Sequence, residues 1–485
     1  MPGKDDPMVI ESNLSLARRA GVLTVGKILQ SVMSLFATIY MAHVLGPVDF
    51  GVLGFTAAIT SYFGLASTLG IPILATREIS QLHDDDEKQG LIVGDVMMLT
   101  GILSLGSYTL LWSLTPIFTV APTLRAILLI SGLQVLINSL SPQWASAGIQ
   151  RTDFNAGANI IGTIIRVGLV FLIIHSPRNL EAVPVLGVIG TLITVAIEWW
   201  LLKQTKPIHC RPSWTRLWSI FRRALPMTTA SAMMQAYSSL DTIFLGYWDG
   251  LGVVGYYNAA YKLVLFLGSF TSVYNQVIFP LATRLYHSDV NHLKVQLRRS
   301  LSITTIITLP IILGGSWLAS PIIRTIFGDR FEAADPLLRI LLWTWGITFA
   351  TLHYGPVLIA CNQERRFARG IALGGAVNLA ANLVTVPLWG AIGAALSILF
   401  TELVILSYMM YYMTHQVGWY GPSIHTILGV ILSCAVMLLG LDLFSRQLGL
   451  FEAIGFGSLL YSASLILTRT VHPAQLKWAL RLLGP

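Results

Sequence analysis

Long, uninterrupted apolar runs recur from Gly21 to Leu467, and they constrain the fold more than any other feature of this chain. The hydrocarbon core of a bilayer is about 30 Å thick, so a helix needs roughly 20 apolar residues to cross it. Many of the runs reach that length. Only 11% of the 485 residues are charged, whereas a soluble domain carries about 25%. The sequence therefore predicts an integral membrane protein.

The runs are continuously apolar and do not alternate with polar residues, which favours helices over a membrane barrel. The first run is longer than the apolar core of a secretory signal, so we interpret it as an uncleaved span. We expect an all-α protein with about fourteen spans, each long enough to cross the bilayer, at 22–45, 52–74, 91–113, 119–140, 156–175, 182–202, 224–247, 254–280, 299–320, 336–360, 368–388, 390–413, 424–444 and 451–468.

Lys and Arg are divided unevenly between the two sides of this topology. With the N-terminus inside, 22 of them fall in inside segments and 5 in outside segments. Short cytoplasmic loops are enriched in Lys and Arg, so we expect a multi-pass protein of the cytoplasmic (inner) membrane with both termini cytoplasmic. The same asymmetry accounts for the net charge of +8, and no nucleic-acid partner is inferred. The three cysteines are far apart and form no metal-binding pattern, so no metal or other cofactor is expected.

The longest inside connection, residues 203–223, has apolar residues at helical spacing beside several arginines. This pattern predicts an amphipathic helix at the membrane interface. It lies near the middle of the chain and is expected to join two halves.

An internal repeat supports that division. Three groups of residues recur in the same order, at offsets of 204, 213 and 203: Thr38–Ile39, Gly46 and Gly51 as Thr242–Ile243, Gly250 and Gly255; Ala147, Gln150, Phe154, Gly157 and Gly162 as Ala360, Gln363, Phe367, Gly370 and Gly375; Gly187, Ile189 and Gly190 as Gly390, Ile392 and Gly393. Each half then holds six spans, an even number, so the repeats are parallel. Parallel repeats related by a pseudo-two-fold axis suit a transporter.

The predicted organisation has six parts. They are a cytoplasmic N-terminal tail (1–21), an N-terminal six-helix bundle (22–202), the amphipathic linker (203–223), a C-terminal six-helix bundle (224–413), two additional spans (424–468) and a cytoplasmic tail (469–485).

Several short patterns carry a family resemblance. They are Leu45-Gly46-Pro47-Val48-Asp49-Phe50-Gly51, Gly70 followed by Arg77-Glu78-Ile79, Ala147-Gly148-Ile149-Gln150-Arg151, Asp241-Thr242-Ile243-Phe244-Leu245-Gly246 and Gly255-Tyr256-Tyr257-Asn258-Ala259-Ala260-Tyr261-Lys262. In order and spacing the chain resembles the polysaccharide-flippase branch of the multidrug/oligosaccharidyl-lipid/polysaccharide exporter superfamily. The resemblance implies a MATE-like V-shaped pair of bundles with alternating access, a cationic central cavity and a polyprenyl-diphosphate oligosaccharide as substrate.

Charged residues within the spans are the first candidates for a site, because a charge at a helix centre costs roughly 2.5–3.5 kcal/mol on insertion scales. Polar residues recur on single helix faces around several of these charges, which favours a hydrated cavity over lipid contact. Arg166 lies near the midplane, and its planar guanidinium matches phosphate oxygens. Lys27 lies nearer the inside and either snorkels or lines the cavity. The predicted cavity residues are Arg166, Lys262, Lys27, Asn159, Gln235, Asn258 and Asn378.

Two acidic residues are candidates for coupling. Asp241 and Lys262 flank one outer turn at similar depth and are expected to form an ion pair. The pair either only stabilises the structure or opens when Lys262 binds substrate phosphate or when Asp241 binds a proton or Na⁺. Glu402 lies in the middle of a span and is a further coupling candidate, whereas Glu198 and Asp95 lie nearer span ends and are expected to be solvated.

The function favoured by these observations is a flippase for lipid-linked oligosaccharide, with no catalytic residue. Its expected partners are that substrate, membrane lipids, H⁺ or Na⁺ as coupling ion, and polysaccharide polymerase or export proteins. The alternatives are a cation-coupled exporter of small drugs and a peptidoglycan-precursor flippase. A membrane enzyme is disfavoured, because the outer loops are short and have no acidic or histidine cluster.

Overall fold

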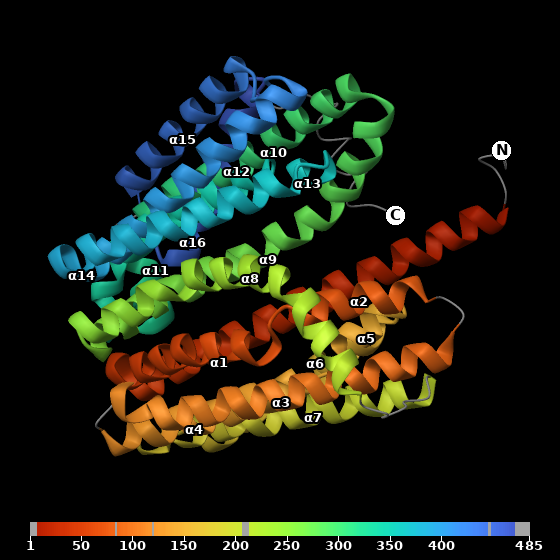
Figure 1. Ribbon diagram of the computed structural model, residues 1–485. Coiled ribbons are helices and arrows are strands. Elements are labelled where there is room, and N and C mark those ends of the chain that lie inside the picture. The colour runs from red at the N-terminus through yellow and green to blue at the C-terminus, as the bar shows by residue number, and fades with distance from the viewer. Residues whose placement is uncertain (1–6, 83–84, 119–120, 206–212, 445–447, 471–485) are drawn as a thin grey trace. The chain divides into compact units, whose positions relative to one another are not determined.

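A computed structural model describes residues 7–82, 85–118, 121–205, 213–444 and 448–470 (Figure 1). The described residues are almost entirely helical and contain no strand. They divide into two compact units, the first from Gly21 to Gly255 and the second from Tyr256 onward, together with the residues before Gly21.

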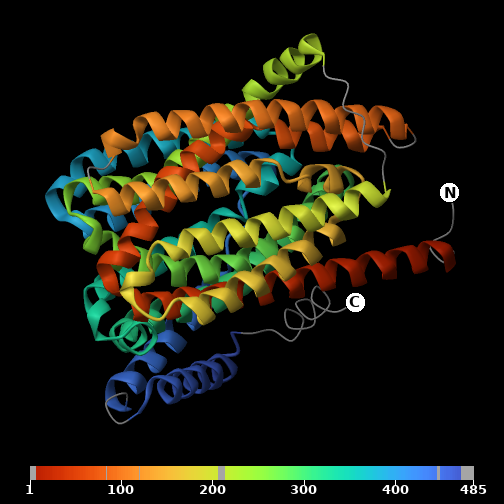
Figure 2. The same ribbon diagram turned by 90° about the horizontal axis from the view of Figure 1, so that it is seen from below.

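The first unit contains eight α-helices and the start of a ninth. They are α1 (Pro7–Thr68), α2 (Ile71–Gln81), α3 (Asp86–Phe118), α4 (Pro122–Ser139), α5 (Gln143–Gly148), α6 (Thr152–Ile173), α7 (Ala182–Thr205) and α8 (Trp214–Trp248), with a 3₁₀ turn at Pro177–Asn179; α9 (Leu251–Ser288) crosses into the second unit. Helices α3, α4, α7 and α6 pack in that order (Figures 1 and 2).

The second unit is built from the remaining helices. They are α10 (Val290–Trp317), α11 (Ala319–Phe327), α12 (Asp335–Thr351), α13 (Gly355–Ala360), α14 (Glu364–Val417), α15 (Ile424–Phe444) and α16 (Leu450–Leu467), with a 3₁₀ turn at Asp329–Ala334. Helix α12 packs on α14 and α10, and α15 forms a hairpin with α16 that contacts α10 (Figure 2).

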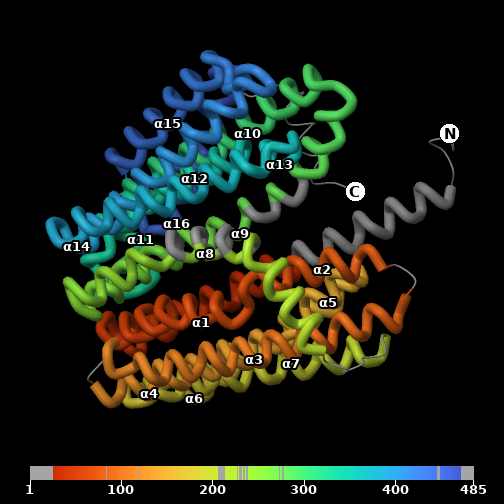
Figure 3. The backbone as a smooth tube through the Cα atoms, viewed as in Figure 1, coloured from red at the N-terminus to blue at the C-terminus, as the bar shows by residue number. Residues whose placement is uncertain are grey.

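Two long helices are each broken by a glycine where the sequence predicts a turn between spans. Gly46 in α1 has φ 77° and ψ 175°, and Gly390 in α14 has φ 54° and ψ −133°. Positive φ is easily adopted only without a Cβ. Helix α14 therefore folds back as two arms (Figure 3). A methyl group added to Gly374 on one arm would lie 2.4 Å from Ile405 Cδ1 on the other.

Ten segments among the described residues are long and apolar enough to cross a membrane, and the α1 and α14 segments each contain one of these breaks. Many large apolar side chains point outward, such as Leu172, Leu388 and Leu467, with exposed fractions of 71%, 66% and 82%. Monomeric soluble proteins rarely expose contiguous apolar surface on this scale. The prediction of a helical multi-pass membrane protein is confirmed, and the number of fourteen spans stays a prediction.

The repeat has a structural counterpart in each unit. Helices α5 and α13 are both six-residue helices, and each precedes a residue with positive φ, Gln150 (59°) and Asn362 (57°). These turns lead into α6 and α14. The matching sequence groups therefore have the same local structure in both units, which is a six-residue helix, a turn and a long helix.

The glycines of the first matching group make a close backbone contact. A Cβ at Gly51 would lie 1.7 Å from the carbonyl oxygen of Leu251, and one at Gly255 would lie 1.9 Å from that of Pro47. Side chains cannot occupy either position, so the turn in α1 and the start of α9 pack against each other directly. We call this pair of segments, 46–51 and 250–255, the outer turns.

The predicted linker lies partly outside the described residues, and Trp214–Arg223 forms the first turns of α8. Leu217 and Ile220 are buried in a cluster with residues of α2, α3 and α5, while Trp214 is 74% exposed. The segment is thus amphipathic. The predicted domain boundaries, including the two tails, stay predictions.

Candidate functional site

Arg166 is half-buried on α6 and lies against α7. A methyl group at Gly190 of α7 would lie 3.0 Å from Arg166 Cβ and 3.5 Å from its Cδ, so the glycine makes room for the arginine stem. Gly162, one turn earlier, faces Thr194 of the same helix. Among the described residues no carboxylate or carbonyl accepts a hydrogen bond from the Arg166 guanidinium. Its positive charge is therefore available to an anion.

Lys27 lies on the helix beside Arg166. Gly26 of α1 faces Ile160 of α6, and Gln30 Nε2 donates to Thr163 Oγ1 over 3.1 Å. This pairing sets Lys27 level with residue 161, so Lys27 and Arg166 differ in depth by about 7–8 Å at 1.5 Å per residue. The Lys27 side chain is exposed in the first unit and has no partner among the described residues. The two predicted cations thus occur on adjacent helices.

Polar residues on α6 and α1, including the predicted cavity residue Asn159, bond to nearby backbone. Asn155 Nδ2 donates to the Gln143 carbonyl over 2.9 Å, and Asn159 Nδ2 donates to the Asn155 carbonyl over 2.7 Å. On α1, Ser31 and Thr38 donate to carbonyls one turn earlier. These residues stabilise the local helical structure. None of these hydrogen bonds goes to the side chain of Arg166 or Lys27.

Gln235 joins α8 to the second arm of α1. Its Nε2 donates to Ser61 Oγ over 2.7 Å and to Ser239 Oγ over 2.9 Å. Asp241, one to two turns further along α8, is only 2% exposed and interacts electrostatically with Tyr62 of α1. The first unit therefore buries a carboxylate close to a tyrosine.

In the second unit, Asn258 is buried and Lys262 is half-buried, both on α9. The predicted pairing of Lys262 with Asp241 joins residues of different units and stays a prediction.

The arms of α14 carry a buried polar ladder. Asn378 and Asn382 are fully buried, and Asn382 Nδ2 donates to the carbonyl oxygen of Asn378 (3.0 Å) and to its side chain (3.1 Å). Thr385 donates to Gly393 O over 2.9 Å and lies 2.6 Å from Ser397 Oγ. Thr385 therefore joins the two arms, and Asn378 is bonded to Asn382 within its own arm.

Glu402 lies on the second arm of α14 and is 2% exposed. No hydrogen bond or ion pair joins its carboxyl group to another described residue. An unpartnered buried carboxyl is stable only when protonated or when a cation joins it. This is the property expected of a coupling group.

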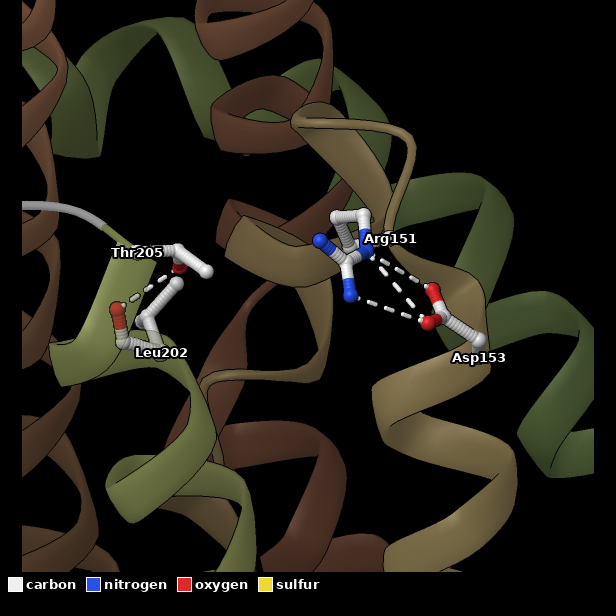
Figure 4. Close-up of polar contacts among 4 residues, drawn as sticks. All are labelled: Arg151, Asp153, Leu202 and Thr205. Carbon is white, nitrogen blue, oxygen red and sulfur yellow. Dashed lines mark hydrogen bonds and ion pairs between the residues drawn. The ribbon is translucent and has the colours of Figure 1, made fainter.

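The expectation that Glu198 and Asp95 are solvated is wrong. Glu198 is fully buried and accepts hydrogen bonds from Ser141 Oγ (2.6 Å) and Gln143 Nε2 (2.7 Å). Asp95 is 3% exposed and pairs with Arg216 over 2.6 Å. Their partners come from other helices, so position along a span could not reveal them. Arg151, by contrast, forms an exposed pair with Asp153 at 3.1 Å, near the end of α7 where Thr205 donates to Leu202 (Figure 4).

One buried cluster escaped the sequence analysis. His353, between α12 and α13, is fully buried, and its Nε2 lies 2.7 Å from the Tyr274 hydroxyl and 3.0 Å from Thr304 Oγ1. Its Nδ1 lies 3.1 Å from the Phe349 carbonyl, and Tyr420 donates to the His353 carbonyl. With Nδ1–H as donor, the single lone pair of Nε2 accepts from the closer hydroxyl, that of Tyr274, while the Thr304 hydroxyl donates to the Ser300 carbonyl over 3.0 Å. The cluster ties α9, α10, α12 and the end of α14 together.

These observations define a polytopic helical membrane protein with an unpaired arginine inside one of its spans. No group of three metal-ligating side chains occurs in the part of the chain that the structure describes. The fold is that of the lipid II flippase MurJ, whose inward closed structure matches with a TM-score of 0.76 at 16% identity over 92% of this chain and 99% of that one. An inward-facing multidrug resistance MATE family transporter of the MOP superfamily also matches, with a TM-score of 0.62 at 13% identity over 82% and 98%.

The chain belongs to the polysaccharide biosynthesis protein family, whose model matches residues 16–286. A protein of Escherichia coli (strain K12) named for O-antigen transport is 23% identical over 84% of this chain and 98% of its own length. A protein of Haloferax volcanii named as a flippase of low-salt glycan biosynthesis is 24% identical over 69% and 72%. The predicted family is confirmed.

Proposed function

We propose that this protein is a flippase that moves a polyprenyl-diphosphate-linked oligosaccharide across the cytoplasmic membrane for cell-surface polysaccharide synthesis. The observation that carries the proposal is Arg166, a half-buried cation with no partner among the described residues. A diphosphate supplies the missing charge, and a guanidinium binds phosphate oxygens through two parallel hydrogen bonds. The names of the Escherichia coli and Haloferax volcanii relatives support the same substrate class.

Transport requires no bond to be made or broken. The sugar diphosphate crosses along the polar side of Lys27 and Arg166, while the polyprenyl tail stays in the lipid. Both termini are cytoplasmic in this proposal, as the distribution of Lys and Arg favours. Asn159 and Gln235 complete the proposed cavity in the first unit, and polymerase or export proteins receive the product. Lys262, Asn258 and Asn378 of the second unit stay predicted cavity residues.

Asp241 and Glu402 are the proposed coupling groups. Glu402 is the stronger of the two, because its carboxyl group is buried without a partner among the described residues. Binding of H⁺ or Na⁺ would remove its unfavourable charge. This coupling also suits a cation-driven drug exporter, the second candidate function. The two are separated by substrate, since a flippase transfers the lipid-linked oligosaccharide between leaflets and an exporter transports the drug itself.

The proposal predicts that a strain lacking this gene accumulates a lipid-linked saccharide on the inner leaflet. Wild-type protein restores surface polysaccharide, and Arg166→Ala fails to restore it while reaching the same level in the membrane. Full restoration by Arg166→Ala would remove this residue from the mechanism. Unchanged saccharide with altered drug efflux would favour the exporter.

Alternating access requires the outer turns to separate when the headgroup leaves. A Cβ at Gly252 would lie 3.6 Å from Val48 Cγ2, which brings two cysteines there within disulfide reach. The pair Val48→Cys and Gly252→Cys should form a disulfide that stops transport until reductant is added. If the disulfide-linked variant transported as fast as the reduced one, the outer turns would not need to separate.

A further inference from the structure

The end of α14 carries an open pocket that the proposed transport path does not use. Its volume is about 610 Å³, within the usual range for small-ligand sites, and it is lined by Ser407, Met410, Tyr411, Thr414, His415 and Trp419. Tyr411 and Trp419 are each 57% exposed. Exposed Tyr and Trp at the end of a membrane helix are typical of the level of lipid headgroups.

Two basic side chains lie beside chain neighbours of the lining residues. Arg366 lies with its Cζ 4.8 Å from the ring centroid of Tyr412, which packs edge-on against Tyr411. Lys294 Nζ comes within 3.0 Å of where a Cβ at Gly418 would lie, next to Trp419. Neither cation is paired with a carboxylate among the described residues. The rim is therefore positively charged and uncompensated.

An apolar stripe runs from the pocket along the same helix face. Leu403 and Phe400 lie one and two turns before Ser407, with exposed fractions of 44% and 56%. They share a face because residues three and four apart on a helix are neighbours. A cationic pocket above an exposed apolar stripe matches an amphiphile with an anionic head and a hydrocarbon tail, whereas a soluble phosphate would leave the stripe unused.

We propose that this pocket binds an anionic phospholipid of the inner leaflet, with the phosphate between Lys294 and Arg366 and an acyl chain along Phe400 and Leu403. Basic pockets on the cytoplasmic side of helical membrane proteins bind anionic headgroups in this way. Inner-leaflet placement follows the predicted topology, in which Lys294 and Arg366 lie in inside segments.

The test is native mass spectrometry of the full chain, purified in detergent and titrated with phosphatidylglycerol or phosphatidylcholine. The double variant Lys294→Gln/Arg366→Gln should lose phosphatidylglycerol adducts about thirtyfold, because each cation near a lipid headgroup contributes about fivefold in affinity. Lys294→Gln alone, which leaves the Arg366–Tyr412 contact intact, should lose about fivefold. Phosphatidylcholine adducts should not change in either variant.

The matched control is Arg77→Gln/Arg222→Gln, which removes two exposed cations from the other unit on the same predicted side. It should keep phosphatidylglycerol binding within about twofold of wild type. Equal losses in control and pocket variants would overturn the proposal, because binding would then follow net charge. Displacement of the lipid by an equal concentration of glycerol phosphate would also overturn it, since the apolar stripe would contribute nothing.

Discussion

The α6–α7 pair in the first unit and the two arms of α14 in the second are equivalent in the repeat, and glycines hold both pairs together. Gly162 and Gly190 bring α6 close to α7, as Gly374 and Gly393 bring the arms of α14 together. The chemistry differs. The residue equivalent to Arg166 at the offset of 213 is Leu379, which is 43% exposed.

The buried carboxylates differ in the same way. Glu198 of α7 is held by Ser141 and Gln143, whereas Glu402, one position beyond its equivalent on α14, has no such partner among the described residues. Among the described residues, the first unit thus offers the unpaired cation Arg166 and the hydrogen-bonded acid Glu198, and the second offers a buried amide ladder and the unpaired acid Glu402. We therefore propose that one scaffold serves anion binding in one half and cation coupling in the other.

The largest effect on transport should come from transferring the arginine from the α6–α7 pair to the arms of α14. Arg166→Leu should lower transport by at least about tenfold, the scale of a lost hydrogen bond to a charged group. Adding Leu379→Arg in the same protein should not restore transport, because Arg166 is proposed to bind the diphosphate and position 379 is not. The measurement is the amount of surface polysaccharide in cells with equal amounts of the protein in the membrane. Restored polysaccharide in the double variant would show that the arginine can act from either position.

The two pairs should also differ in tolerance of a methyl group. Gly393→Ala would place a Cβ 2.1 Å from the carbonyl oxygen of Thr385, and overpacking against backbone costs about 1–3 kcal/mol. A Cβ at Gly190 would lie 3.0 Å from Arg166 Cβ and clear of other backbone, so Gly190→Ala should lower the thermal stability less than Gly393→Ala does while lowering transport a few-fold. Thermal unfolding in detergent distinguishes them, and equal melting temperatures would contradict the difference.

The two acids provide a further contrast. Glu402→Gln should leave the fold intact and remove the dependence of transport on a proton or sodium gradient. Glu198→Gln should instead lower stability by about 1–3 kcal/mol through its lost hydrogen bonds and keep the gradient dependence. Transport into vesicles with imposed gradients measures this, and retained dependence in Glu402→Gln would exclude it as the coupling group.

The smallest effects should come from the asparagines. Asn159→Ala removes one hydrogen bond to the backbone of its own helix, a contribution of about 0.5–1.5 kcal/mol, and should change transport less than Arg166→Leu does. Asn378→Ala should act mainly on stability, because Asn378 is buried within the ladder. If Asn159→Ala matched the loss in Arg166→Leu, the amide would have to contact substrate.

The sequence predicted the features that depend on local pattern. Apolar runs located the helices, and Gly46 and Gly390 marked the breaks, because a positive φ favours glycine. It did not predict the burial of Glu198 and Asp95 or the cluster at His353. The partners of these residues lie on helices far away in the chain, so no spacing in the sequence indicates them. Histidine alone signals neither burial nor its neighbours.

The central claim is that a free arginine in the first unit carries a diphosphate headgroup across the membrane. It is tested most directly by reconstituting the purified protein in liposomes with a fluorescent polyprenyl-diphosphate oligosaccharide and measuring its transfer between leaflets. The wild-type protein should transfer it, Arg166→Lys should transfer it more slowly, and Arg166→Ala should match protein-free liposomes. Equal transfer by wild type and Arg166→Ala would contradict the account.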